Sequence, residues 1–231
     1  RHVMNTDHVP PPQWDWYVSI DHGLKNPTAI LWHAISPEGI VVTFYEHYVS
    51  EWSISQHVTK IREVNAMLGK EPIMYIGDPS MHQRNAITMT SVHTEYLMHG
   101  IGIVNGSRDI QAGINKMNDY LRTNRWLITQ RCANLIQEVR TYGWKTHINS
   151  RTADRTNPYE EPQKRNDHAM DSSRYFFTYV PMLPPSAPVV KERPKLEQIR
   201  LLQSQGQLPW RMDERLVAED YNKEYGWGEY E

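Results

Sequence analysis

The chain has 231 residues, of which 39% are hydrophobic and 23% charged, and its formal net charge at pH 7 is −2. Such a composition is typical of a globular protein with one sizeable domain and a tail, and it excludes disorder throughout the chain. The chain is not basic overall, so any contact with nucleic acid must come from a local patch or from another domain. Its longest apolar run is too short to cross a bilayer, and no basic and apolar leader precedes it.

The first half of the chain predicts a meander of three antiparallel strands. Residues 1–13, which include three successive prolines, are expected to form an extended lead-in. Residues 16–21, 28–35 and 40–48 have the apolar and β-branched composition of strands, and turn-forming residues separate them. Because the connections are short, consecutive strands should pair antiparallel.

Helices and strands alternate after the meander. Ser53, followed by Gln56 three residues later, forms a capping-box pattern for a helix that Gly69 is placed to end. The elements expected next are a strand over residues 73–77, a helix over 90–99, a strand over 101–104, a helix with Ser107 as its N-cap, a short edge strand over 126–128 and a helix over 130–142.

A single cysteine, Cys132, lies in the last of these helical patterns. It excludes an intrachain disulfide framework and is typical of a reducing compartment. Its apolar neighbours recur at helical spacing, so we expect a small buried core residue here rather than a nucleophile.

The last third of the chain predicts one more core helix, over residues 165–179. Its packing face is formed by small and apolar residues at helical spacing, namely Ala169, Ser173, Phe176 and Val180. The preceding residues 143–164 are polar and turn-rich, which predicts an exposed loop, and a proline-rich linker and charged tail follow from residue 181. Together the elements predict an α/β domain over residues 14–180, in which a mixed sheet combines the meander with parallel strands and carries helices on both faces.

Four aspartates end or lie on these predicted core elements. Asp21 closes the first strand, Asp78 closes the strand over residues 73–77, and Asp167 and Asp171 lie four residues apart on the final helix. A sheet can bring such acids together at one edge, where they would repel one another unless a divalent cation bound between them. Oxygen ligands suit Mg²⁺ or Mn²⁺, and two such ions about 4 Å apart can hydrolyse a phosphodiester bond. The acids therefore predict a two-metal phosphodiester-cleaving site.

We predict Asp21 as the bridging ligand and Asp78 and Asp171 as flanking ligands, which makes these three the catalytic residues. Asp167 and His168 are auxiliary candidates that could orient water, hold a metal weakly or support the ligands. Simpler explanations stay open for each residue. Asp21 and Asp78 are also typical of turns at strand ends, and the helix residues are also typical of a solvated polar face.

Phosphate binding requires positive charge near the metals. The basic residues that flank the acids, Lys25, Lys164 and Arg165, are the best candidates. Further candidates that could equally be ordinary surface charges are Arg84, Arg108, Lys116, Arg151 and Arg155. The polar loop over residues 143–164 could lie along the duplex backbone.

Three strings of the sequence carry a family resemblance: SIDHGLKNPTAI, YIGDPS and NDHAMDSSRYFF, in this order and spacing. With residues 110–144, they resemble the C-terminal nuclease domain of the large terminase subunit of tailed bacteriophages, over residues 14–180. The resemblance implies a ribonuclease-H-like (RNase H-like) fold related to RuvC-type resolvases and metal-dependent cutting of concatemeric double-stranded viral DNA during genome packaging. On this resemblance Asp21, Asp78 and Asp171 match the metal-binding acids, and His168 matches an auxiliary histidine of some members.

The resemblance also implies partners and a location. An N-terminal ATPase domain, the portal protein, the small terminase subunit and double-stranded DNA are the expected partners, in the cytoplasm of the infected bacterial host. No G-x-x-x-x-G-K-[ST] phosphate loop occurs, and the chain starts at Arg1, so we expect a fragment that lacks the ATPase domain. The tail over residues 181–231 could dock on a partner or pack on the domain itself.

Two other functions stay open. A junction resolvase or transposase-like nuclease of the same fold would prefer branched DNA or require dimerisation. A docking module that had lost catalysis would keep the fold and leave DNA intact.

Overall fold

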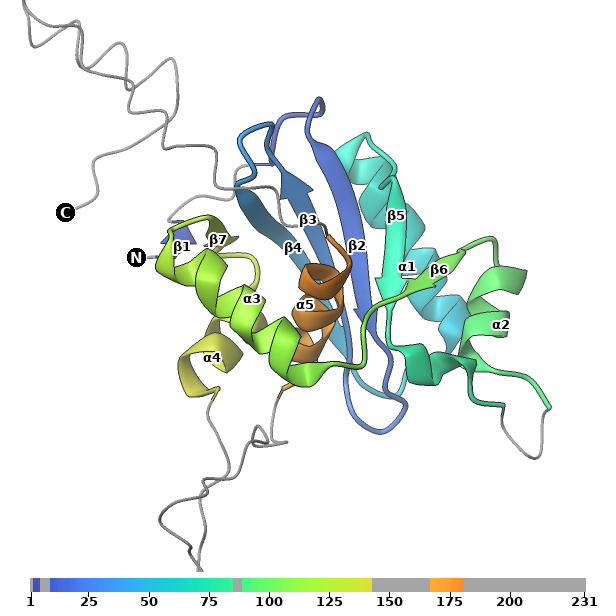
Figure 1. Cartoon of the computed structure of the whole chain (residues 1–231). Helices are drawn as coiled ribbons and strands as arrows, with labels where there is room; N and C mark the ends of the chain where they lie inside the picture. Colours follow the sequence, from blue (N-terminus) through green and yellow to red (C-terminus); the bar gives the residue numbers. More distant parts are fainter. Residues whose placement is uncertain (1, 5–8, 85–88, 143–166, 181–231) are drawn as a thin grey trace, which may run out of the picture. The chain divides into compact units, whose positions relative to one another are not determined.

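A seven-stranded mixed sheet forms the centre of the described structure (Figure 1). The computed structural model describes residues 2–4, 9–84, 89–142 and 167–180, all within one compact unit that spans residues 2–184. In chain order the strands are β1 (Val3–Met4), β2 (Asp15–Asp21), β3 (Thr28–Ile35), β4 (Val41–Val49), β5 (Met74–Gly77), β6 (Ile103–Asn105) and β7 (Trp126–Thr129). The helices are α1 (Ile54–Leu68), the 3₁₀ helix η1 (Pro79–His82), α2 (Val92–Met98), α3 (Ile110–Arg122), α4 (Ala133–Thr141) and α5 (His168–Tyr179).

The strand order is β1-β7-β4-β3-β2-β5-β6. Strands β2, β3 and β4 form the antiparallel meander, and the remaining neighbours pair in parallel. The predicted mixed α/β sheet is therefore confirmed.

The edge position predicted for residues 126–128 was wrong. Strand β7 lies between β4 and β1, and all four of its residues are buried. The reason is that Val3 and Met4, within the expected lead-in, pair in parallel with Ile128 and Thr129. Strand pairing between residues this far apart in sequence leaves no local signal.

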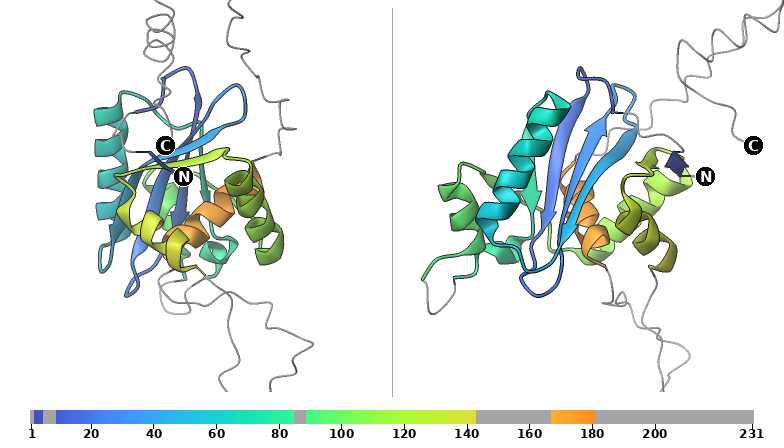
Figure 2. Two further views of the ribbon diagram at one scale, coloured as in Figure 1. Left: turned by 90° about the vertical axis from the view of Figure 1, so that its left-hand side faces the viewer. Right: turned by 180° about the vertical axis from the view of Figure 1, so that it is seen from behind.

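Helices cover both faces of the sheet, as predicted (Figure 2). The core on one face contains residues of α1 and α2, whereas the core on the other contains residues of α3, α4 and α5. Strand β3 contributes alternate residues to each core: Ala29 and Leu31 to the α5 side, and Ile30 and Trp32 to the α1 side. None of the helices in the described ranges is long and apolar enough to span a membrane.

Local capping signals identified one helix start correctly and one incorrectly. The Ser53–Gln56 capping box is present on α1, and Gly69 ends that helix in the left-handed conformation with a φ of 70°. Helix α3 begins later than predicted. Asp109 is its N-cap and accepts from the Ala112 amide at 2.9 Å, while Ser107 Oγ accepts from the Asp109 amide.

The last two helices are shorter than predicted. Helix α4 starts at Ala133 rather than residue 130, with Cys132 fully buried at its N-cap as a core residue. Helix α5 starts at His168 rather than residue 165, and its predicted packing face is buried. The loop predicted over residues 143–164 and the tail over residues 181–231 lie outside the described residues.

A buried polar network fastens α5 to the sheet. Ser19 Oγ on β2 lies 2.7 Å from Ser172 Oγ on α5 and 2.8 Å from His33 Nε2 on β3. His33 Nδ1 in turn lies 2.9 Å from Thr43 Oγ1 on β4. Burial lowers the pKa of His33 to about 3, so the ring is neutral, and a substrate cannot reach side chains this deeply buried. The network is structural, and it ends one residue from Asp171.

We expect Gly106→Ala to destabilise the fold because Gly106 packs closely against α5. A Cβ atom there would lie 2.7 Å from Tyr175 Cβ and 2.9 Å from Tyr175 Cα, so backbone would have to move. Overpacking of this kind costs about 1–3 kcal/mol in the free energy of unfolding, measured here by urea denaturation. The matched control is Gly102→Ala, since no atom lies within 4 Å of a Cβ at that position. Equal stability of the two variants would contradict the close approach of α5.

Candidate functional site

Parallel pairing of β2 with β5 brings two of the predicted acids to the same edge of the sheet. Asp21 is the last residue of β2, and Asp78 directly follows β5. Ile20 and Gly77 are register partners, so the two aspartates emerge side by side at the carboxyl ends of neighbouring strands. Helix α5 packs on β2, β3 and β5 and brings the first turn that carries Asp171 to this edge.

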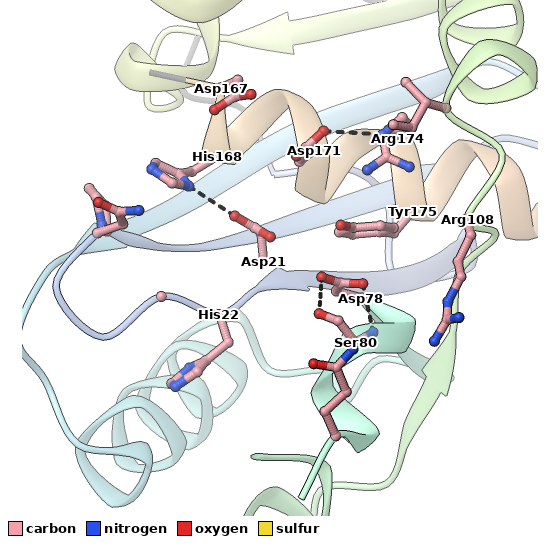
Figure 3. A pocket seen from close by; sticks show the side chains of 15 residues that line it. Asp21, His22, Asp78, Ser80, Arg108, Asp167, His168, Asp171, Arg174 and Tyr175 are labelled. Carbon is pink, nitrogen blue, oxygen red and sulfur yellow. Dashed lines mark hydrogen bonds and ion pairs between the residues drawn. The ribbon is translucent and has the colours of Figure 1, made fainter. Parts of the chain in front are cut away.

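All five predicted catalytic and auxiliary residues line one pocket of about 730 Å³ (Figure 3). Asp21, Asp78 and Asp171 reach it from β2, the end of β5 and α5, and Asp167 and His168 reach it from the start of α5. The pocket is also lined by residues that the sequence analysis did not assign to the site, including His22, Ser80, Arg174 and Tyr175.

Each of the three catalytic candidates has a partner within the protein. Asp21 Oδ2 lies 3.1 Å from His168 Nδ1, and Asp171 Oδ1 accepts from Arg174 Nε at 3.1 Å. Asp78 Oδ1 accepts from the Ser80 amide at 2.8 Å, which makes it the N-cap of η1. The turn-capping explanation therefore holds for Asp78, and its carboxylate also faces the pocket.

Burial and mutual repulsion make the ionised acids unfavourable. Burial raises the pKa of Asp21; the hydrogen bond from His168 opposes this, and the nearby carboxylates of Asp78 and Asp167 add to it. Burial also raises the pKa of Asp171 to about 6, against the charge of Arg174 and with further repulsion from Asp21 and Asp167. The hydrogen bond with Asp21 is the main cause that raises the pKa of His168. A cation in the pocket would neutralise this negative charge.

The residues fit a divalent metal in type and location but not in spacing. Three carboxylates from separate elements supply the oxygen donors that Mg²⁺ and Mn²⁺ prefer. Among the described residues, however, no three His, Cys, Asp or Glu side chains form a group ready to hold an ion. Asp21, Asp78 and Asp171 would therefore have to adjust their side chains to bind one.

The predicted DNA-binding residues are placed unequally. Arg108 lines the pocket itself. Lys25 is exposed in the turn whose neighbours Asn26 and Pro27 line the pocket, and Arg84 is exposed just beyond η1. Lys116 does not line the pocket, because its Nζ donates to the Val180 carbonyl at the end of α5. The remaining candidates lie outside the described residues: Arg151, Arg155, Lys164 and Arg165.

The sequence analysis missed two charged residues that act on the candidate ligands. Arg174 is almost fully buried, pairs with Asp171 and stacks on Tyr175 at 4.5 Å. Its i, i+3 spacing from Asp171 was a signal that could have identified it. Glu138 on α4 accepts a hydrogen bond from the Met170 amide. Its signal was an acidic residue at helical spacing from buried Leu135.

We expect Asp171→Asn to raise the free energy of unfolding in metal-free buffer by roughly 1–3 kcal/mol at pH 8, because asparagine mimics the neutral carboxyl. The folded-state pKa of about 6 lies above the ordinary value of 3.8, so the folded protein binds the proton more tightly. The gain should therefore shrink as the pH falls from about 6 towards 4 and disappear below that window. Urea denaturation with a chelator at several pH values measures it.

Asp119→Asn is the matched control for this experiment. Asp119 and Arg122 form the same i, i+3 pair on α3, but both are exposed. We expect no gain there at any pH, because little desolvation is relieved. A loss of stability in Asp171→Asn at pH 8 would mean that its ion pair with Arg174 outweighs burial.

Comparisons with known proteins identify the fold. No family model and no curated protein matches the sequence. The solved structure of a large terminase from a thermophilic bacteriophage is 23% identical, with a TM-score of 0.61 over 76% of this chain and 41% of that chain. The P22 large terminase nuclease domain is 16% identical, with a TM-score of 0.61 over 76% of this chain and 86% of that chain.

A third solved structure, the large terminase nuclease from the thermophilic phage G20c with bound magnesium, is 7% identical. Its TM-score is 0.53, over 73% of this chain and 83% of that chain. The chain thus spans less than half of the first of these terminases but most of the two isolated nuclease domains. The chain has the RNase H-like fold of the large terminase nuclease domain, as the sequence resemblance implied.

Proposed function

We propose that this chain is a metal-dependent endonuclease domain that cuts concatemeric double-stranded viral DNA during genome packaging. The observation that carries the proposal is the meeting of Asp21, Asp78 and Asp171, from three separate elements, in one pocket. The shared fold supports it, because the G20c nuclease of this fold is described with bound magnesium. Fold alone would not suffice, since one fold hosts many activities.

Asp21, Asp78 and Asp171 would hold two Mg²⁺ or Mn²⁺ ions, with Asp21 between them. Bound there, the ions supply an activated water and charge stabilisation for the leaving oxygen. His168 orients the Asp21 carboxylate through its Nδ1 contact, and Asp167 adds negative charge beside it. Arg174 orients Asp171 and places positive charge in the pocket lining, where a phosphate oxygen would be stabilised.

The duplex would contact the protein through few basic residues. Arg108 in the pocket lining and exposed Lys25 and Arg84 near it are the described candidates, and Lys164 and Arg165 belong to the same proposal. With so few phosphate contacts and a net charge of −2, binding should be weak and sensitive to salt.

The packaging role requires partners beyond this chain. The thermophilic-phage large terminase that is 41% covered has also been solved in complex with ADP, and in that structure this chain covers 42% of it. We therefore propose that the nuclease works beside an ATPase domain, with the portal protein and the small terminase subunit as further partners.

A catalytically silent docking module is the second candidate function. It is favoured by the spacing of the acids, since the described residues contain no group ready to hold an ion. The two functions differ in whether the protein cuts DNA.

We expect the protein to convert supercoiled plasmid to nicked and linear forms with Mn²⁺ or Mg²⁺, and Asp21→Ala to slow this by about 100-fold or more, because a bridging ligand is lost. A chelator should stop the reaction. Asp15→Ala is the matched control, since Asp15 is an exposed aspartate on the same strand. Intact plasmid under both metals would favour the docking module.

We expect Arg108→Ala to weaken binding to duplex DNA equally for different sequences. Loss of one phosphate contact should lower the slope of log affinity against log salt by about 1, measured by fluorescence anisotropy. Arg122→Ala is the control, because Arg122 is an exposed arginine outside the pocket lining. An unchanged slope would remove Arg108 from the interface.

A further inference from the structure

Helix α5 carries Asp171 and His168, yet its N-terminus is not capped by its own residues. Asp167 occupies the N-cap position and makes no side-chain capping bond. Glu138 of α4 takes this role instead, because its Oε2 accepts from the Met170 amide at 2.9 Å and the carboxylate also accepts from the Ala169 amide. An ionised acceptor at a helix N-terminus binds the free amides and opposes the helix dipole.

The second oxygen of Glu138 is held from the sheet. Tyr48 Oη on β4 donates to Glu138 Oε1 at 2.9 Å. Glu138 is only 3% exposed, and this burial raises its pKa to about 7, while the bonds from Met170 and Tyr48 oppose the rise. A carboxylate is costly to bury, so its two oxygens are both used to hold elements together.

Helix α4, which carries Glu138, is held in the same way. Its N-cap residue Cys132 makes no side-chain capping bond. Glu46 of β4 accepts from the Asn134 amide at 3.0 Å and from the Leu135 amide at 2.8 Å. Glu46 and Tyr48 are two residues apart on one strand and therefore point to the same face of the sheet.

We propose that Glu138 is a positioning residue, which caps the first turn of α5 from α4 and thereby sets where His168 and Asp171 lie relative to Asp21. In this arrangement β4 orients α4 through Glu46, and α4 orients α5 through Glu138. The inference rests on the proposed function in that it treats Asp171 as a metal ligand. Residues that support ligands in this way typically change metal affinity by about 10–100-fold when removed.

The test compares Mn²⁺ affinity, measured by electron paramagnetic resonance titration of the full chain, among three variants. Glu138→Ala removes the cap and should weaken Mn²⁺ binding by about 10-fold or more. Glu138→Gln keeps an oxygen that can accept from Met170 and should restore most of the affinity. Ile61→Ala destabilises the core on the opposite face of the sheet and should bind Mn²⁺ as the unsubstituted protein does. Equal loss in Ile61→Ala, or no recovery in Glu138→Gln, would overturn the proposal.

Hydrogen exchange provides a readout that does not require metal. In Glu138→Ala the amides of Ala169 and Met170 should exchange faster relative to that of Phe176 in the same helix. If the unsubstituted protein binds no Mn²⁺, the proposed function fails, and faster exchange at these two amides still supports the positioning role. Unchanged exchange would overturn it.

Tyr48→Phe covers the case in which Glu138→Ala does not fold. It removes only the hydroxyl that donates to Glu138 Oε1. We expect weaker Mn²⁺ binding and faster exchange at Met170, in the same direction as Glu138→Ala but smaller. Wild-type behaviour in both measurements would count against the proposal.

Discussion

Carboxylates held largely out of water at the pocket impose the main electrostatic cost in this fold. Burial raises the pKa of both Asp21 and Asp171, and the carboxylate of Asp167 raises both further. His168 and Arg174 reduce this cost by pairing with one acid each. A fold seldom keeps such an arrangement without a use for it, because neutral residues would be more stable there. The proposed metal ions supply that use.

The surrounding structure holds α5 from two sides. Ser172 on its second turn bonds to Ser19 of β2 within a buried polar network, and Glu138 caps its first turn. Close packing adds to this, because Gly106 lets the chain approach the backbone of Tyr175. Rotation or sliding of α5 would break these contacts together, so Asp171 and His168 stay near Asp21. What adjusts on metal binding must then be the side chains, whose present spacing does not form a complete metal cage among the described residues.

Local patterns predicted most of the elements and the three catalytic candidates. The strand over residues 28–35 and the capped helix α1 were correct because alternation, a capping box and a terminal glycine act within a few residues. The N-cap of α3 was wrong because Ser107 and Asp109 are both good caps, and only the packed helix selects between them. Likewise β7 was taken as an edge strand, since its pairing with Val3 and Met4 involves residues more than 100 positions away.

The linear order of residues specifies which acids stand at the ends of the core elements, and hence the type of chemistry that the pocket could perform. Folding in three dimensions adds that these acids share a pocket, that Arg174 and His168 pair with them, and that Glu138 on one helix caps another. The two kinds of information differ in range. Strand alternation and caps depend on neighbouring residues, whereas burial, ion pairing and interhelix capping depend on distances that exist only once the chain has folded.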